Sequence, residues 1–121
     1  MDALNTCALF GFPIIGGVVV EREISRIPQT NKRQDVLDFY FRVVTEEALL
    51  SDEIDARAAV LMAANVKQED AYHVATAEAY GADYLLTIDK RLLNASKRLE
   101  LYVNVINPID FMEEYKKWRQ Y

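Results

Sequence analysis

The sequence predicts an α/β fold, in which short parallel strands alternate with helices. Two observations favour this class. Segments with helical periodicity alternate, along the second half of the chain, with apolar runs of about five residues that are too short to form helices. The 121 residues are 51% hydrophobic and 27% charged, which is the composition of a compact globular domain. We therefore expect a single domain over residues 1–121, with a short parallel sheet flanked by helices.

The expected elements follow from local patterns. Leu50, Ile54, Ala58 and Leu61 recur at helical spacing and predict an amphipathic helix over residues 46–65. An alanine-rich stretch that stops at Gly81 predicts a second helix over residues 70–80. The remaining predictions are a strand over 84–87, a helix over 90–99, a strand over 102–106 and a last helix that starts at Pro108.

The N-terminal part allows two interpretations. Residues 3–10 have the character of a helix. The following apolar residues 14–20 are interrupted by Gly16 and Gly17, which would suit a hairpin turn. Alternatively, a strand ends near Ile15 and a helix starts near Val18. Local sequence fits both.

Charge and cysteine content restrict the function classes. The net charge is −5, and an acidic protein is poorly suited to unaided non-specific binding of nucleic acid. Residues 90–121, however, hold 7 Lys and Arg against 4 Asp and Glu, so a local basic patch is possible there, with a solvated helix face as the alternative. Cys7 is the only cysteine, which excludes an intramolecular disulfide. No apolar run approaches the length of a membrane span and no secretory signal is visible, so we expect a cytoplasmic protein without membrane contact.

Three motifs in the second half of the chain resemble those of a known family. Asp70-Ala-Tyr-His73 opens a predicted helix, Thr87-Ile-Asp89 follows a predicted strand, and Asn107-Pro108 precedes the last helix. In this order and spacing they resemble the C-terminal half of a PIN domain, the fold of many toxin endoribonucleases of the VapC type. Residues 17–28 resemble the family segment in which a strand leads into a helix that carries a glutamate. Glu23 is the better match for that glutamate, and Glu21 is the second choice.

The resemblance, over roughly residues 10–115, implies a PIN-like three-layer fold and a metal-dependent endoribonuclease. It implies Glu23, Asp70 and Asp89 as catalytic residues and as ligands of Mg²⁺ or Mn²⁺. Clustered carboxylates suit this chemistry because they hold hard cations, which neutralise the scissile phosphate and generate hydroxide. RNA is then the substrate and a cognate antitoxin protein is a partner. Residues expected to support the site or contact the substrate are His73, Thr87, Lys90 and Arg91.

Each of these residues also has a purely structural interpretation. Asp70 and Asp89 both stand where a helix begins, so either could be an N-cap. Glu23 taken alone is an ordinary surface helix residue, and His73 suits a partly buried structural position. A catalytically inactive PIN-like module that binds RNA or a partner protein is the alternative function. A receiver-like signalling module is disfavoured, because it needs an acidic pair at the end of an early strand.

The chain departs from the family pattern at its start. PIN domains open with a central strand that ends in an Asp, and this sequence begins after that point, so we expect the first strand and its Asp to be missing. Loss of that carboxylate predicts weak ribonuclease activity at best. A sheet without its central strand exposes unpaired backbone groups, which predicts a homodimer or higher oligomer, with the N-terminal segment or the helix around Trp118 at the contact.

Overall fold

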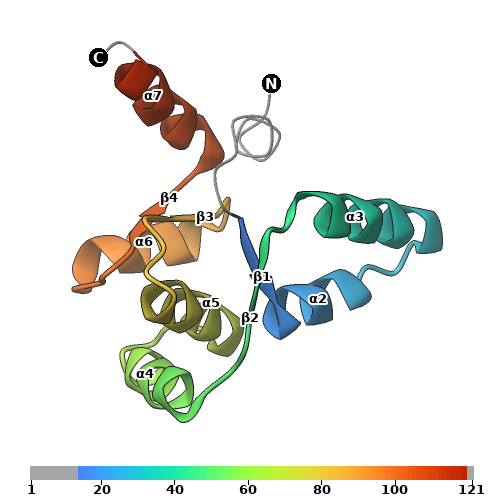
Figure 1. The fold of residues 1–121 in the computed structure, drawn as a ribbon. Helices are drawn as coiled ribbons and strands as arrows, with labels where there is room; N and C mark the ends of the chain where they lie inside the picture. The colour runs from blue at the N-terminus through green and yellow to red at the C-terminus, as the bar shows by residue number, and fades with distance from the viewer. Residues whose placement is uncertain (1–13, 120–121) are drawn as a thin grey trace. The chain divides into compact units, whose positions relative to one another are not determined.

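A computed structural model describes residues 14–119 of the chain, leaving aside the side chains of residues 18–20, 23, 43, 115, 118 and 119. The described chain divides into two compact units, residues 14–50 and residues 51–119, which we treat separately. Each unit combines helices with a short parallel pair of strands, so the predicted α/β class is confirmed (Figure 1). The single domain over residues 1–121 stays a prediction, and the helix expected over residues 3–10 lies outside the described residues.

In the first unit, one strand leads directly into a helix. β1 (Ile15–Gly17) continues into α2 (Val18–Ser25), and α3 (Thr30–Val43) then returns the chain to β2 (Glu46–Ala48). The two strands pair in parallel, with Gly16 opposite Glu47. The hairpin interpretation of Gly16 and Gly17 is therefore wrong, and the strand-then-helix interpretation is confirmed.

The predicted helix over residues 46–65 begins later than expected. α4 covers Asp52–Ala63, and residues 46–48 form β2 instead. The start of α4 is set by Ser51, whose Oγ accepts a hydrogen bond of 3.2 Å from the Ile54 backbone N–H. Pairing with β1 determines the conformation of residues 46–48, and such a long-range contact leaves no periodicity in the local sequence. Within α4 the expected apolar face is present, since Ile54, Ala58 and Leu61 are buried.

The second unit follows the predicted order of elements closely. After α4 come α5 (Gln68–Ala79), β3 (Tyr84–Leu86), α6 (Lys90–Arg98), β4 (Asn104–Ile106) and α7 (Pro108–Arg119). β3 and β4 pair in parallel, with Leu86 opposite Ile106. Gly81 has a φ of +66°, the left-handed conformation that favours glycine beyond the end of a helix.

The hydrophobic core of the second unit lies between its helices and the β3–β4 pair. α4 packs on α5, α5 packs on β3, and α6 packs on β4. Small residues allow α5 to approach its neighbours closely, since Ala71 and Ala75 are almost fully buried. The buried members of this cluster are Ile54, Ala58, Leu61, Val66, Ala71, Val74, Ala75, Ala77, Leu92, Ala95 and Val103.

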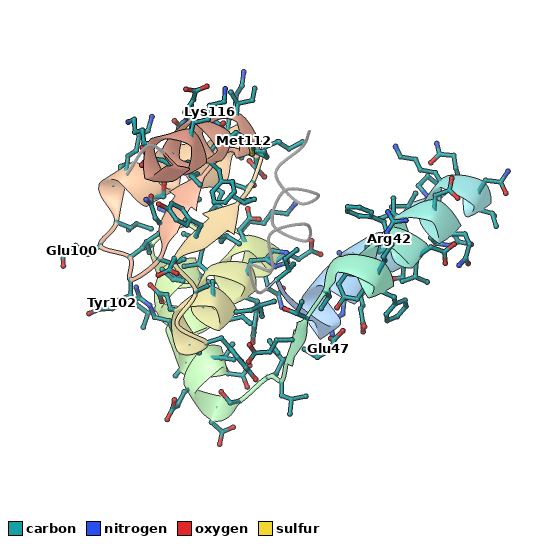
Figure 2. The ribbon with its side chains drawn as sticks, turned by 45° about the horizontal axis from the view of Figure 1, so that its top comes forward. Arg42, Glu47, Glu100, Tyr102, Met112 and Lys116 are labelled. Carbon is teal, nitrogen blue, oxygen red and sulfur yellow. The ribbon has the colours of Figure 1, made fainter. Side chains whose placement is uncertain are left out.

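A buried carboxylate joins three segments of the second unit. The side chain of Glu78 on α5 is only 7% exposed, and its Oε1 accepts a hydrogen bond of 2.8 Å from Arg57 Nε on α4. Its Oε2 accepts a bond of 2.7 Å from the Tyr102 backbone N–H, and Arg57 Nη2 also donates to the Glu100 carbonyl at 3.2 Å. Figure 2 shows Glu100 and Tyr102 on the segment that leads into β4. Glu78 thus fixes where that segment begins.

In the first unit, the buried Tyr40 on α3 connects both strands. Its hydroxyl accepts a hydrogen bond of 2.9 Å from the Gly17 N–H and donates to the Glu47 carboxylate, 3.1 Å from Oε1. The Tyr40 hydroxyl lies where a side chain on Gly16 would begin, so β1 must carry glycine at that position. Burial, with Glu47 adding to it, raises the pKa of Tyr40 to about 12.

We predict that Tyr40→Phe lowers the free energy of unfolding by about 1–3 kcal/mol at pH 8, because the Gly17 N–H loses its acceptor. Unfolded Tyr40 titrates near pH 10 and folded Tyr40 near 12, so the stabilisation from its neutral hydroxyl is complete below pH 10 and falls as the pH rises toward 12. Urea unfolding at pH 8 and pH 11 measures both effects. The gap between wild type and variant should narrow at pH 11.

Tyr102→Phe is the matched control, because the Tyr102 residue is 86% exposed. Equal stability of the Tyr40→Phe variant and wild type at pH 8 would contradict a role for the hydroxyl.

Candidate functional site

The carboxyl edge of the β3–β4 pair gathers polar residues from two segments. The strands end opposite each other at Leu86 and Ile106, and the Thr87 N–H extends the pairing by donating to the Ile106 carbonyl at 3.0 Å. Thr87 and Asp89 follow β3, whereas Asn107 follows β4. In α/β proteins, ligands bind beyond the carboxyl ends of parallel strands. This edge is therefore the natural place for a site in the second unit.

Asp89 caps α6. Its Oδ1 accepts a hydrogen bond of 2.8 Å from the Arg91 N–H, which makes it the side-chain cap of the helix. Its own backbone N–H donates to Thr87 Oγ1 at 3.1 Å, so the threonine hydroxyl holds the turn that precedes the cap. The capping interpretation of Asp89 is confirmed. A carboxylate has a second oxygen, so capping through Oδ1 is compatible with binding a cation.

Asp70 does not cap its helix. The N-cap of α5 is Lys67, which makes no side-chain capping bond, and Asp70 is the third residue of the helix. The capping interpretation of Asp70 is therefore wrong. Asp70 is half-buried, and His73, also half-buried, lies one turn further along α5.

Asp70 lines a hollow between the start of α5 and one face of α6. The hollow has a volume of about 500 Å³. Its floor is formed by the buried residues Val66, Leu92 and Ala95, which belong to the core of the unit. The polar residues around it are Asn65, Lys67, Asp70, Arg91, Asn94 and Arg98. The structure thus places Asp70 and Arg91 on one hollow, beside the helix that Asp89 caps.

The other predicted site residues have different positions. Glu23 lies on α2 in the first unit, and its side chain is outside the described residues, so its convergence with Asp70 and Asp89 stays a prediction. Glu21, the second choice, is half-buried on α2. Lys90 is exposed at the first position of α6.

Sequence reasoning missed Asp110 and most of the hollow. Asn107 Oδ1 accepts a bond of 2.8 Å from the Asp110 N–H, and Asn107 Nδ2 donates to Asp110 Oδ2 at 2.9 Å. An acid three residues after an N-cap asparagine is a local signal for this reciprocal arrangement. The spacing of Arg91, Asn94 and Arg98 was an available signal for one face of α6. The contribution of Lys67, from another helix, has no local signal.

Carboxylate oxygens of Asp70 and Asp89 are the donor type that Mg²⁺ and Mn²⁺ prefer, and Mg²⁺ usually takes only one or two protein carboxylates. The donor chemistry in the second unit therefore fits such an ion. Among the described side chains of residues 14–119, which do not include that of Glu23, no group of three or more His, Cys, Asp or Glu residues is gathered as a metal site. None of the helices in this described range is long and apolar enough to cross a membrane.

No family model, curated protein or solved structure matches the chain.

We predict that Asp89→Ala lowers the free energy of unfolding by about 1 kcal/mol, because α6 loses its side-chain cap. Asp89→Asn should change it by only a few tenths of a kcal/mol, since Asn caps helices about as well as Asp. Urea unfolding measures both. Asp83→Ala serves as the control, because Asp83 is exposed at the opposite edge of the same strand pair. Equal losses in the two Asp89 variants would assign the stabilisation to charge instead of capping.

Proposed function

We propose that the chain is a PIN-like, metal-dependent endoribonuclease of the toxin type, which hydrolyses RNA phosphodiester bonds with Mg²⁺ or Mn²⁺ in the cytoplasm. The observation that carries the proposal is the neighbourhood of Asp70, Asp89 and Arg91. Asp70 and Arg91 line one hollow, and Asp89 bonds to the Arg91 N–H at the carboxyl end of β3. A nuclease site needs this combination, because carboxylates hold the cation and a guanidinium binds the phosphate.

The proposal assigns a role to each residue. Asp70 and Asp89 hold the ion, together with Glu23 as the resemblance to PIN domains implies. The ion, when bound, neutralises charge on the phosphate and lowers the pKa of the attacking water. One of the carboxylates accepts the proton of that water, and Arg91 binds a phosphate oxygen. Thr87 holds the turn that positions Asp89.

A module that binds RNA or a partner protein without cleaving RNA is the second candidate. One observation favours it: Asp89 already has a structural use as the cap of α6. The two candidates differ in whether bound metal leads to cleavage.

We predict that the chain cleaves single-stranded RNA only weakly in the presence of Mn²⁺, because it lacks the first-strand Asp of the PIN pattern, and that EDTA abolishes the cleavage. Asp70→Asn and Asp89→Asn should each lower the rate by roughly a hundredfold, a typical cost of removing one group that stabilises transition-state charge. Gel analysis of a labelled RNA measures the rate. Calorimetric titration with Mn²⁺ should show weaker binding in both variants.

Asp83→Asn is the matched control, since it removes the same charge from the opposite edge of the strand pair. Cleavage that resists EDTA, or equal rates for wild type and both site variants, would refute the proposal. Mn²⁺ binding without cleavage would favour the binding module.

The proposal also includes self-association, with a cognate antitoxin protein as a further partner. The sheet that β3 and β4 form has only two strands, each of three residues. This is fewer strands than most sheets contain. Beside its carboxyl edge, Ile88 is 83% exposed and Ile109 is 77% exposed. Apolar side chains exposed beside the edge of such a small sheet favour an interface, and we assign it to a second copy of the chain.

We predict a homodimer or larger species at micromolar concentration, which the double variant Ile88→Ser, Ile109→Ser converts to monomer. Sedimentation velocity measures the change. Val60→Ser, at a residue that is 57% exposed on α4, is the control and should leave the assembly intact. A monomeric wild type would rule out this part of the proposal.

A further inference from the structure

One face of α6 presents a row of polar side chains to the hollow. Arg91, Asn94 and Arg98 are spaced by three and four residues, so they follow one another along the same face of the helix. Lys67, at the start of α5, lies on the same hollow. Two helices thus supply three cations to one surface.

These three cations have no ion-pair partner in the described part of the chain. The ion pairs recorded there join other residues, such as Arg57 with Glu78 and Lys116 with Glu113. Among the described residues, Asp70 is the only acid that lines the hollow, so three positive charges face one negative charge there. In a protein with a net charge of −5, this is a local reversal of sign that favours an anionic ligand.

The first turn of α5 carries two acids, Glu69 and Asp70, which offset the partial positive charge at the N-terminus of the helix. The positive potential at the hollow therefore comes from the side chains of Lys67, Arg91 and Arg98. Beneath the rim, Val66, Leu92 and Ala95 belong to the packed core. The floor is therefore fixed, whereas Lys67, Arg91 and Arg98 are exposed to solvent.

We infer that this hollow binds the phosphate backbone of a single-stranded RNA that runs along α6. The identity of the ligand as RNA rests on the proposed function. Arg91 and Arg98 are seven residues apart, which corresponds to roughly 10 Å along a helix. A row of this length suits successive phosphates of an RNA strand, each bound by a different arginine.

The residues that line the hollow also determine how the RNA is recognised. None of the described residues that line it is aromatic, so they offer no platform on which bases stack. Guanidinium and ammonium groups bind phosphate oxygens without reading the sequence. Binding at the hollow therefore tolerates different base sequences.

Binding of a fluorescent 12-nucleotide RNA, measured by anisotropy in EDTA, tests the inference without cleavage. The double variant Arg91→Ala, Arg98→Ala should bind about tenfold more weakly at low salt, and its slope of log affinity against log salt should be shallower by about 1.4, from two lost phosphate contacts. RNAs of different sequence should lose affinity equally. Circular dichroism checks that the double variant is folded.

Lys116→Ala, Lys117→Ala is the matched control, because it removes two cations from α7, on which Figure 2 labels Lys116. Both are exposed and paired with glutamates of the same helix. Equal affinity and slope for wild type and the Arg91, Arg98 variant would overturn the inference. So would a wild-type chain that binds no RNA at low salt, or one whose RNA is displaced by inorganic phosphate at the same ionic strength as a chloride control that leaves it bound.

Failure of this inference and failure of the nuclease proposal give different results. If the Arg91, Arg98 variant binds RNA normally while Asp70→Asn abolishes Mn²⁺-dependent cleavage, the nuclease proposal is supported and the RNA does not bind at the hollow. If binding falls in the arginine variant and no chain cleaves RNA, the hollow binds RNA in a protein that does not cut it. If polyglutamate binds at the hollow and RNA does not, the ligand is an acidic protein segment and the inference is wrong.

Discussion

The arrangement of the second unit depends on the buried carboxylate of Glu78, whose charge must be paired. A buried carboxylate such as Glu78 is costly unless hydrogen-bond donors surround it. Arg57 and the Tyr102 backbone N–H are its donors, so α4 and the segment before β4 are both tied to α5. β4 is thereby presented to β3 in register, and the carboxyl edge at which Thr87 and Asn107 meet is a result of that register. The position of the candidate site therefore depends on how Glu78 is paired.

Asp89 links the start of α6 to the positions of the charged residues around the hollow. As the N-cap it defines the residue at which α6 begins. The starting residue and the direction of a helix together determine which side each later residue faces. The capping bond therefore helps to orient Arg91 and Arg98 toward the hollow that Asp70 lines. Asp89 is needed for the start of α6 and is also proposed as a metal ligand. Its loss would therefore affect both stability and function.

The elements of the second unit could be predicted because their signals are local. Gly81 marks the end of α5, Asp89 is a strong capping residue, and Pro108 suits the first position of a helix. The course of residues 46–48 could not be predicted, because two glutamates and an alanine have little strand propensity and adopt the strand only by pairing with β1. α3 was not anticipated either, since its mixture of polar and aromatic residues shows no clear apolar face.

The site was only partly predictable for the same reason. The positions of Asp70 and Asp89 on their elements follow from motifs of a few residues. The meeting of Asp70 with Lys67 and Arg98 around one hollow depends on the packing of α5 and α6, which no local pattern contains. The resemblance to PIN domains supplied Glu23, on α2 in the first unit, and its role remains a prediction.

The lack of room for a side chain at Gly16 limits which substitutions this sequence can accept. A Cβ at that position would lie 2.8 Å from Tyr40 Cζ, so the strand and the ring fill one volume together. A larger residue in β1 would displace the ring, and with it the hydroxyl that holds Glu47 of β2. Substitutions at positions 16 and 40 are thus coupled by sterics. In a set of natural variants of this chain, we would expect glycine at the first position to accompany an aromatic hydroxyl at the second.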